Sequence, residues 1–334
     1  MIESVHFENF KALRDTTLPL GPFTLIVGPN GSGKSTALQA LQNMRSPSHE
    51  HFTRFVTVGQ EESEVAVEVK WATPHSGAIT RSRWVRDVNF LPEHRPPGER
   101  RFSEPEKAHL SQWLARIQVY SLDANAIAAP VALNPDMVLQ PNGSFLAGVL
   151  DRLRDHEPER FEAVNEELGR WLPEFDRILF DTPNRGERSI ALRTREGQHR
   201  IPANDLSQGT LLALAMLTLA YVPTPPPFVG FEEPDRGIHP RLLRDVRDAL
   251  YRLAYPESFG EKREPVQVVA TTHSPYFVDL FRDHPEEIVI AEKIGWEARF
   301  VCLTDLPNLD EILKDSHLGD AWYSGILGGV PVEP

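Results

Sequence analysis

The segment at residues 28–36, GPNGSGKST, constrains the fold of this chain more than any other part of the sequence. It matches the pattern of a glycine, four residues and Gly-Lys-Ser. A nearly continuous apolar run at 23–27 precedes it, and residues 35–44 follow with apolar side chains at helical spacing. The order strand, glycine loop and helix is typical of a phosphate-binding loop, and a glycine-rich turn without a ligand is the competing interpretation.

The chemistry of such a loop assigns roles to its residues. Its glycines let backbone N–H groups turn toward phosphate oxygens, and the amino terminus of the helix adds a favourable dipole. Lys34 would neutralise the β- and γ-phosphates, and Ser35 would bind a magnesium ion. The sequence therefore predicts a nucleoside triphosphate site with Lys34 among its catalytic residues.

A second polar feature is a pair of carboxylates after the apolar strand expected at 228–231. At the carboxyl end of a parallel strand, Glu232 would hold the metal through water, and Glu233 would act as general base for the attacking water. Two adjacent acids at a strand end are as often simply solvated. Their place relative to the other motifs favours the functional interpretation.

Two further motifs are weak when taken alone. His273 follows the apolar strand expected at 266–270 and could donate a hydrogen bond to the γ-phosphate or to the water, although a lone histidine is more often structural. Ser207, Gln208 and Gly209 precede an apolar helix at 211–222, which is an anion-binding arrangement or only a helix cap.

The order of these four motifs resembles that of the ATPase heads of the ABC superfamily, specifically the RecF, SMC and OLD-like branch. The resemblance extends over nearly the whole chain. Residues 10–13 resemble the family's opening hairpin, residues 232–240 its acidic strand end and D-loop, and residues 318–329 the tail of small bacterial ATPases of this branch.

The resemblance implies a head-to-tail homodimer around two Mg²⁺-ATP. Each ATP would lie between the phosphate loop of one subunit and the signature Ser207-Gln208-Gly209 of the other. Asn30 would contact the γ-phosphate or its water, Thr36 the α-phosphate, and His273 would be the switch histidine. The remaining nucleotide-binding residues of the loop would be Gly31, Ser32, Gly33, Lys34 and Ser35.

The sequence departs from the family at two motifs and leaves one unassigned. Gln208 stands where ABC transporters usually have glycine, and Glu232 stands where aspartate is usual. Both changes are familiar in the OLD-like branch and do not indicate inactivity. Gln60 and Gln140 are alternative candidates for the Q-loop glutamine.

The fold class expected is α/β: a P-loop NTPase of the ABC head type with a mixed or parallel central sheet, an antiparallel β subdomain and an inserted helical lobe. Residues 1–334 would form one ABC-type domain. Segments 1–91 and 200–334 would form its nucleotide-binding core with the antiparallel part, and 92–199 the inserted lobe. Residues 92–107 have no apolar period and are expected to be a mobile surface excursion.

Composition limits the remaining possibilities. A net charge of −13 argues against general, sequence-independent binding of nucleic acid but does not exclude a local basic patch. Arg81, Arg83, Trp84 and Arg86 combine basic and aromatic residues as nucleic-acid grooves do, but the acidic character of the whole chain favours a solvated strand face. The single cysteine, Cys302, is expected to be a small core residue, and no segment indicates a secretion signal or a membrane span, so a cytoplasmic location is expected.

The leading hypothesis is an ATP-driven dimer that controls DNA or a separately encoded nuclease or effector protein, in genome maintenance or anti-phage defence. No long heptad repeat and no Asp-x-Asp pair of a Toprim nuclease is found, so DNA tethering and intrinsic nuclease activity are not expected. The alternatives are a nucleotide-sensing scaffold with negligible hydrolysis and, less favoured, the nucleotide-binding subunit of a transporter.

Overall fold

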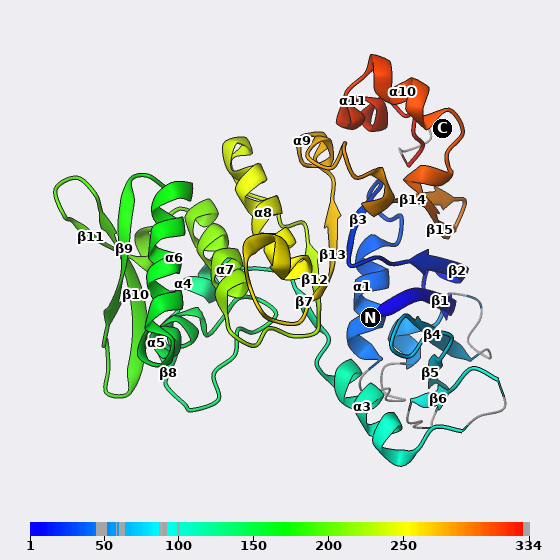
Figure 1. Cartoon of the computed structure of the whole chain (residues 1–334), viewed down its shortest axis with the longest axis horizontal. Coiled ribbons are helices and arrows are strands. Elements are labelled where there is room, and N and C mark those ends of the chain that lie inside the picture. Colours follow the sequence, from blue (N-terminus) through cyan, green and yellow to red (C-terminus); the bar gives the residue numbers. More distant parts are fainter. Residues whose placement is uncertain are drawn as a thin grey trace. The chain divides into compact units, whose positions relative to one another are not determined.

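The chain divides into two compact units in its computed structural model (Figure 1). The structure describes residues 1–44, 52–57, 59, 64–86, 88, 92–98 and 101–329, so the Q-loop candidate Gln60 lies outside the described residues. Unit 1 comprises Met1–Val119, Pro226–Phe231 and Pro265–Pro334. Unit 2 comprises Tyr120–Pro225 and Glu232–Glu264.

A mixed sheet holds the phosphate loop. Among the described residues it has the strand order β15-β14-β3-β13-β12-β7 (Figure 1). Strand β3 is parallel to both β13 and β14, whereas β15 runs antiparallel to β14. Every residue of β3 and β13 is buried, as expected for parallel strands with both faces covered. The strand bounds are β3 Phe23–Val27, β7 Gln118–Tyr120, β12 Phe228–Glu232, β13 Gln267–Thr272, β14 Ile288–Ile294 and β15 Glu297–Cys302.

A second, antiparallel sheet also belongs to unit 1. Its strand order among the described residues is β2-β1-β4-β5-β6. Val65, Val67, Val69 and Trp71 alternate along β4 and are all buried, whereas Lys70 on the other face is exposed, as is typical of a half-exposed antiparallel strand. The bounds are β1 Ile2–Phe10, β2 Leu13–Pro19, β4 Val65–Trp71, β5 Ile79–Trp84 and β6 Glu93–Arg95.

Residues 92–107, expected to be a mobile surface excursion without a periodic pattern, form regular secondary structure over about half of their described length, so the expectation is wrong there. Strand β6 pairs with β5, and helix α3 spans Glu104–Ala115. Ser103 and Glu106 form a capping box, in which the Ser103 backbone N–H donates to Glu106 Oε2 at 2.9 Å. A serine three residues before a glutamate predicts a helix start, but the expectation for this segment did not use that signal and rested on the local proline and charge content.

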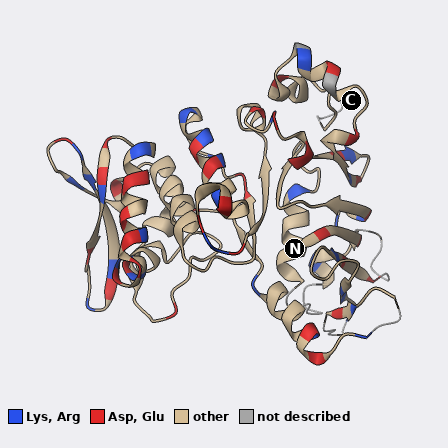
Figure 2. Cartoon of the chain, in the orientation of Figure 1, with Lys and Arg blue, Asp and Glu red and all other residues tan. Residues whose placement is uncertain are grey.

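Unit 2 is a helical lobe with a β-hairpin. Helix α7 is buried from Thr210 to Tyr221 and packs against α6 and α8. It carries no charged residue, whereas α6 and α8 have interspersed acidic and basic residues (Figure 2). The consecutive helices α5 and α6 pack against each other. The bounds are α4 Ala124–Ala128, β8 Val131–Ala132, α5 Leu146–His156, α6 Pro158–Trp171, β9 Phe175–Asp181, β10 Glu187–Thr194, β11 Arg200–Pro202, α7 Gln208–Tyr221 and α8 Leu243–Ala254.

The remaining helices of unit 1 are short, apart from α1 (Lys34–Asn43), which follows the phosphate loop. Helix α11 packs against α9 so closely that a Cβ on Gly319 would lie 2.2 Å from the Pro275 carbonyl oxygen. In the described part of the chain, no helix is both long enough and apolar enough to cross a bilayer. The short helices are α2 Phe52–Phe55, α9 Pro275–Asp279, α10 Leu309–Asp315 and α11 Leu318–Tyr323.

Candidate functional site

The phosphate loop connects the carboxyl end of β3 to the first turn of α1. Gly33 is the N-cap of α1 and has a φ of 94°, a left-handed conformation that favours glycine. Lys34 is 5% exposed, and its Nζ donates hydrogen bonds to the carbonyl oxygens of Gly28 at 2.8 Å and Pro29 at 2.9 Å. The loop thus curls around the ammonium group of its own lysine.

The surroundings of the loop explain two of its glycines. A Cβ on Gly28 would lie 2.3 Å from the Ala291 carbonyl oxygen, and Gly28 has a φ of 156°. A Cβ on Gly33 would lie 2.9 Å from Ala298 Cβ and 2.9 Å from Leu13 Cδ2. Neighbouring strands therefore leave no room for a side chain at either position.

The loop presents polar groups suited to an anionic ligand. Asn30, Gly31 and Ser35 are exposed, and Thr36 is half-buried. Ser32 is fully buried, and its Oγ has no hydrogen-bond partner among the described residues. Because a buried hydroxyl without a partner costs free energy, this atom favours a ligand that completes its hydrogen bonding.

His273 leaves the central sheet beside the loop. Thr272 pairs with Val27 in the parallel register of β13 and β3, so His273 and Gly28 both follow the sheet edge at the same level. The next turn is fixed locally, since the Ser274 backbone N–H donates to Thr272 Oγ1 at 3.0 Å. The histidine therefore lies at the carboxyl edge of the sheet, where α/β proteins place ligand groups.

The predicted carboxylates begin a tight turn in unit 2. Glu232 is the last residue of β12, and the sheet order has one strand, β13, between β3 and β12. Glu233 has a φ of 47°, a strained conformation for a residue with a side chain. The Arg236 backbone N–H donates to the Glu233 carbonyl oxygen at 2.9 Å, and Arg236 Nη1 lies 4.0 Å from Glu233 Oε2.

The signature segment packs against this turn. Ser207 caps α7, because its Oγ accepts a hydrogen bond from the Thr210 backbone N–H at 3.1 Å. A Cβ on Gly209 would lie 2.8 Å from the Gly237 carbonyl oxygen, and a Cβ on Gly237 would lie 3.4 Å from Gln208 side-chain atoms. Unit 2 therefore brings the signature residues and the acidic turn together.

Other sequence candidates contribute less to a site. Gln140, the remaining Q-loop candidate, donates from its amide to the Val138 carbonyl oxygen at 3.1 Å, within its own loop. Cys302 is half-buried. Burial and, to a smaller extent, the nearby Asp305 carboxylate raise the pKa of its thiol, which opposes a nucleophilic role. No cluster of three or more His, Cys, Asp or Glu able to hold a metal occurs in the described ranges.

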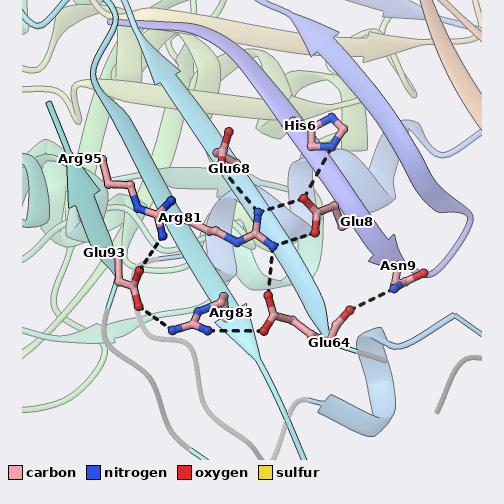
Figure 3. A network of polar contacts seen from close by, with 9 residues as sticks. All are labelled: His6, Glu8, Asn9, Glu64, Glu68, Arg81, Arg83, Glu93 and Arg95. Carbon is pink, nitrogen blue, oxygen red and sulfur yellow. Dashed lines mark hydrogen bonds and ion pairs between the residues drawn. The ribbon is translucent and has the colours of Figure 1, made fainter. Parts of the chain in front are cut away.

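The basic segment of β5 is a charge-paired strand face (Figure 3). Arg81 forms a two-pronged hydrogen bond with Glu8, at 2.9 and 2.7 Å, and a third with Glu64 at 3.0 Å. Arg83 contacts Glu93 at 2.5 Å, and Trp84 is fully buried. Arg81 and Arg83 form ion pairs with carboxylates of the same sheet, so the strand-face interpretation is favoured over a nucleic-acid groove.

Sequence reasoning did not identify the β14–β15 hairpin as a neighbour of the phosphate loop. Ala291 and Ala298 approach the loop glycines from this hairpin. Strand β14 pairs with β3 although the two lie more than 250 residues apart in the chain. No local pattern signals such a pairing.

Two family models match the chain. One, described as "AAA domain, putative AbiEii toxin, Type IV TA system", matches residues 86–279. The other, "AAA ATPase domain", matches residues 1–73. Together they place an ATPase domain across both units.

A curated relative and several solved structures are similar to the chain. An OLD nuclease of Thermus scotoductus is 25% identical over 84% of this chain, which spans 60% of that relative's length. The SMC head bound to the C-terminal winged-helix domain of ScpA has a TM-score of 0.63 at 17% identity, covering 90% of this chain and 96% of its own. A Pyrococcus furiosus SMC head with an extended coiled coil, bound to the ScpA C-terminal domain, has a TM-score of 0.61 at 16% identity, covering 94% and 98%. These structural likenesses show the fold of an ABC-type head.

Proposed function

The chain belongs to the ATPase family whose AAA-domain model covers residues 86–279, and from that membership we propose that it binds Mg²⁺-ATP at the phosphate loop and hydrolyses it as a homodimer. The observation that carries this proposal is the loop itself. A buried lysine ammonium is enclosed by loop carbonyls, in the same loop as a buried Ser32 hydroxyl that has no partner among the described residues, and the loop follows β3 in register with His273.

Each loop residue has a role in the proposed site. The backbone N–H groups of Gly31, Ser32 and Gly33 bind phosphate oxygens, and Lys34 exchanges a loop carbonyl for the β- and γ-phosphates. Asn30 contacts the γ-phosphate or the attacking water, and Thr36 the α-phosphate.

The same residues suit a magnesium ion. Among the described residues no cluster of side chains forms a complete metal site, which is usual for a Mg²⁺ ion whose other ligands are phosphates and water. Ser35, which is exposed at the start of α1, and Glu232 would complete its shell. The ion would neutralise charge that develops on the phosphates.

Glu233 is the proposed general base. Its carboxylate takes a proton from the water that attacks the γ-phosphorus, while the bond to the bridging oxygen breaks and ADP leaves. His273 donates a hydrogen bond to the γ-phosphate or to this water. The signature Ser207-Gln208-Gly209 of the partner subunit closes the site.

One substitution separates this enzyme from a nucleotide-sensing scaffold. Glu233→Gln preserves size and removes the base, so ATP binding should persist while the steady-state ATPase rate falls by at least about 100-fold. Glu196→Gln, at an exposed turn of unit 2, is the matched control and should retain the wild-type rate. If wild type and Glu233→Gln share one background rate, the chain is a scaffold and not an ATPase.

Dimerisation has its own test. Glu233→Gln should accumulate a dimer in light scattering at saturating ATP and remain a monomer without nucleotide. A protein that stays monomeric in both conditions would refute the shared site, whatever its affinity for ATP.

We also propose that the dimer controls DNA or a separately encoded nuclease or effector, in genome maintenance or anti-phage defence. The relative named as a nuclease supports a nuclease partnership, and the SMC heads solved with ScpA domains support a protein partner. DNA titrations with and without ATP, at several salt concentrations, would distinguish the two. ATP-independent weak binding that vanishes at physiological salt would exclude DNA as the controlled partner.

A further inference from the structure

The β14–β15 hairpin lines the phosphate loop at three of its glycines. The Ala291 carbonyl oxygen lies 2.3 Å from where Gly28 would carry a Cβ, and Ala298 Cβ lies 2.9 Å from the corresponding point on Gly33. Between these contacts, Lys293 Nζ lies 3.9 Å from the Cβ position of Gly31. A lysine ammonium is therefore held at the exposed rim of the loop.

The pairing of the hairpin explains why the lysine faces the loop. Ala291 pairs with Phe300 and Lys293 pairs with Ala298, and paired or alternate residues of an antiparallel hairpin share one face. The two alanines are buried where the hairpin meets the loop. Lys293 is thus the charged residue on the face that meets the loop.

The charges near Lys293 leave its ammonium available. Glu292 and Glu297 lie on the opposite face of the hairpin, and Glu297 Oε1 lies 3.5 Å from Arg14 Nη1. In the portion of the chain that is described, no carboxylate forms an ion pair with Lys293. Its Nζ lies 5.8 Å from the ring centre of Trp296, a side chain that is 81% exposed. A cation over an indole face is stabilised weakly and remains free to bind an anion.

We propose that Lys293 is a second phosphate-binding cation of the nucleotide site, an inference that rests on the proposed function. Lys34 is hydrogen-bonded to Gly28 and Pro29 inside the loop, whereas Lys293 reaches the rim formed by exposed Asn30 and Gly31. A lysine on a flexible stem can move a few ångströms to contact a phosphate oxygen. The two lysines bind the phosphate chain of a nucleoside triphosphate together.

The test is an equilibrium titration of the full chain with a fluorescent ATP analogue and Mg²⁺. Lys293→Gln should weaken binding about 10-fold, the effect of losing one charge-assisted contact. Lys293→Arg, which keeps the charge, should stay within about threefold of wild type. Lys314→Gln, at an exposed position of α10, makes the same charge change and should bind as wild type does.

Salt separates a charge contact from a packing defect. The gap between wild type and Lys293→Gln should narrow as KCl rises, because salt screens the interaction of exposed charges. A salt-independent gap that arginine does not restore, or wild-type affinity in Lys293→Gln, would overturn the inference. Lys34→Ala reports on the premise: if that variant binds the analogue as wild type does, the proposed nucleotide site itself is wrong.

Discussion

A buried amide should contribute several kilocalories per mole to the stability of unit 1. Gln267 is fully buried at the start of β13. Its Nε2 donates to the carbonyl oxygens of Ile2 at 2.7 Å and Gly21 at 2.9 Å, and its Oε1 accepts from the Ile2 backbone N–H at 2.7 Å. One side chain thus joins the opening strand and the turn before β3 to β13, the strand that His273 follows.

The cost of removing this amide follows from its three hydrogen bonds. Each contributes about 1 kcal/mol net, and buried backbone groups left without a partner add a desolvation cost. Gln267→Met preserves volume and removes all three bonds, so the free energy of unfolding should fall by about 3 to 5 kcal/mol.

Urea unfolding followed by tryptophan fluorescence would measure this change. Every tryptophan except Trp171 belongs to unit 1, so the signal reports mainly on that unit. Gln112→Met, on an exposed position of α3, is the matched control and should change stability by less than about 0.5 kcal/mol. A loss below about 1 kcal/mol in Gln267→Met would refute the reasoning, because it would mean that the three bonds are not made or are replaced by water.

Three further predictions concern the phosphate loop, the signature segment and the antiparallel sheet. Gly28→Ala should abolish ATP binding and lower the thermal midpoint, because its Cβ would meet a carbonyl oxygen at 2.3 Å. Gly186→Ala, whose Cβ would meet no atom of the described residues within 4 Å, should cost only about 1 kcal/mol of backbone strain. Gly209→Ala should lower the ATPase rate on the order of 10- to 100-fold, since its Cβ would lie 2.8 Å from the backbone of the turn that carries the proposed base. Burial and, to a smaller extent, the charge of Lys107 hold the pKa of His94 below its ordinary 6.5. The free energy of unfolding measured in urea should therefore be highest above pH 6.5 and fall as the pH drops through the folded-state pKa. The fall should be smaller in His94→Gln.

Each of these predictions has a contrary result. Equal thermal midpoints for Gly28→Ala and Gly186→Ala would mean that the hairpin does not crowd the loop. A wild-type ATPase rate in Gly209→Ala would mean that the close approach within unit 2 relaxes at no functional cost. If stability rises as the pH falls below 6.5, His94 is protonated in the folded state and its burial is not the dominant influence.

Local patterns predicted the elements whose signal is contained in a short window. The apolar run before the phosphate loop and the apolar stretch of α7 each appear in the structure at nearly the expected bounds. Helix α7 begins a turn earlier than its apolar run because Ser207 supplies the cap. The capping box of α3 is also visible in the sequence, but the expectation for that segment rested on its proline and charge content alone.

Contacts between distant segments were not predictable in this way. The register of β14 on β3 depends on the whole sheet, and nothing in residues 288–302 indicates that they border the phosphate loop. Likewise, the motif pattern predicts a role for Gly209 in anion binding, whereas its approach to Gly237 becomes visible only when the two segments are folded together. The roles of the site residues remain predictions that the substitutions above would test.

The structure provides a second reason why glycine is required at two positions of the phosphate loop. Sequence reasoning attributes them to backbone N–H groups that must face phosphates, while the structure adds that Ala291 and Ala298 occupy the space a side chain would need at Gly28 and Gly33. Loss of ATP binding after a glycine substitution would therefore report on hairpin packing as much as on phosphate contact. Substitutions that leave the backbone in place carry the functional information, and Lys293 is better suited than Lys34 for this purpose. Lys34 also stabilises the loop by donating hydrogen bonds to the carbonyl oxygens of Gly28 and Pro29, whereas the ammonium of Lys293 has no hydrogen bond or ion pair to lose among the described residues.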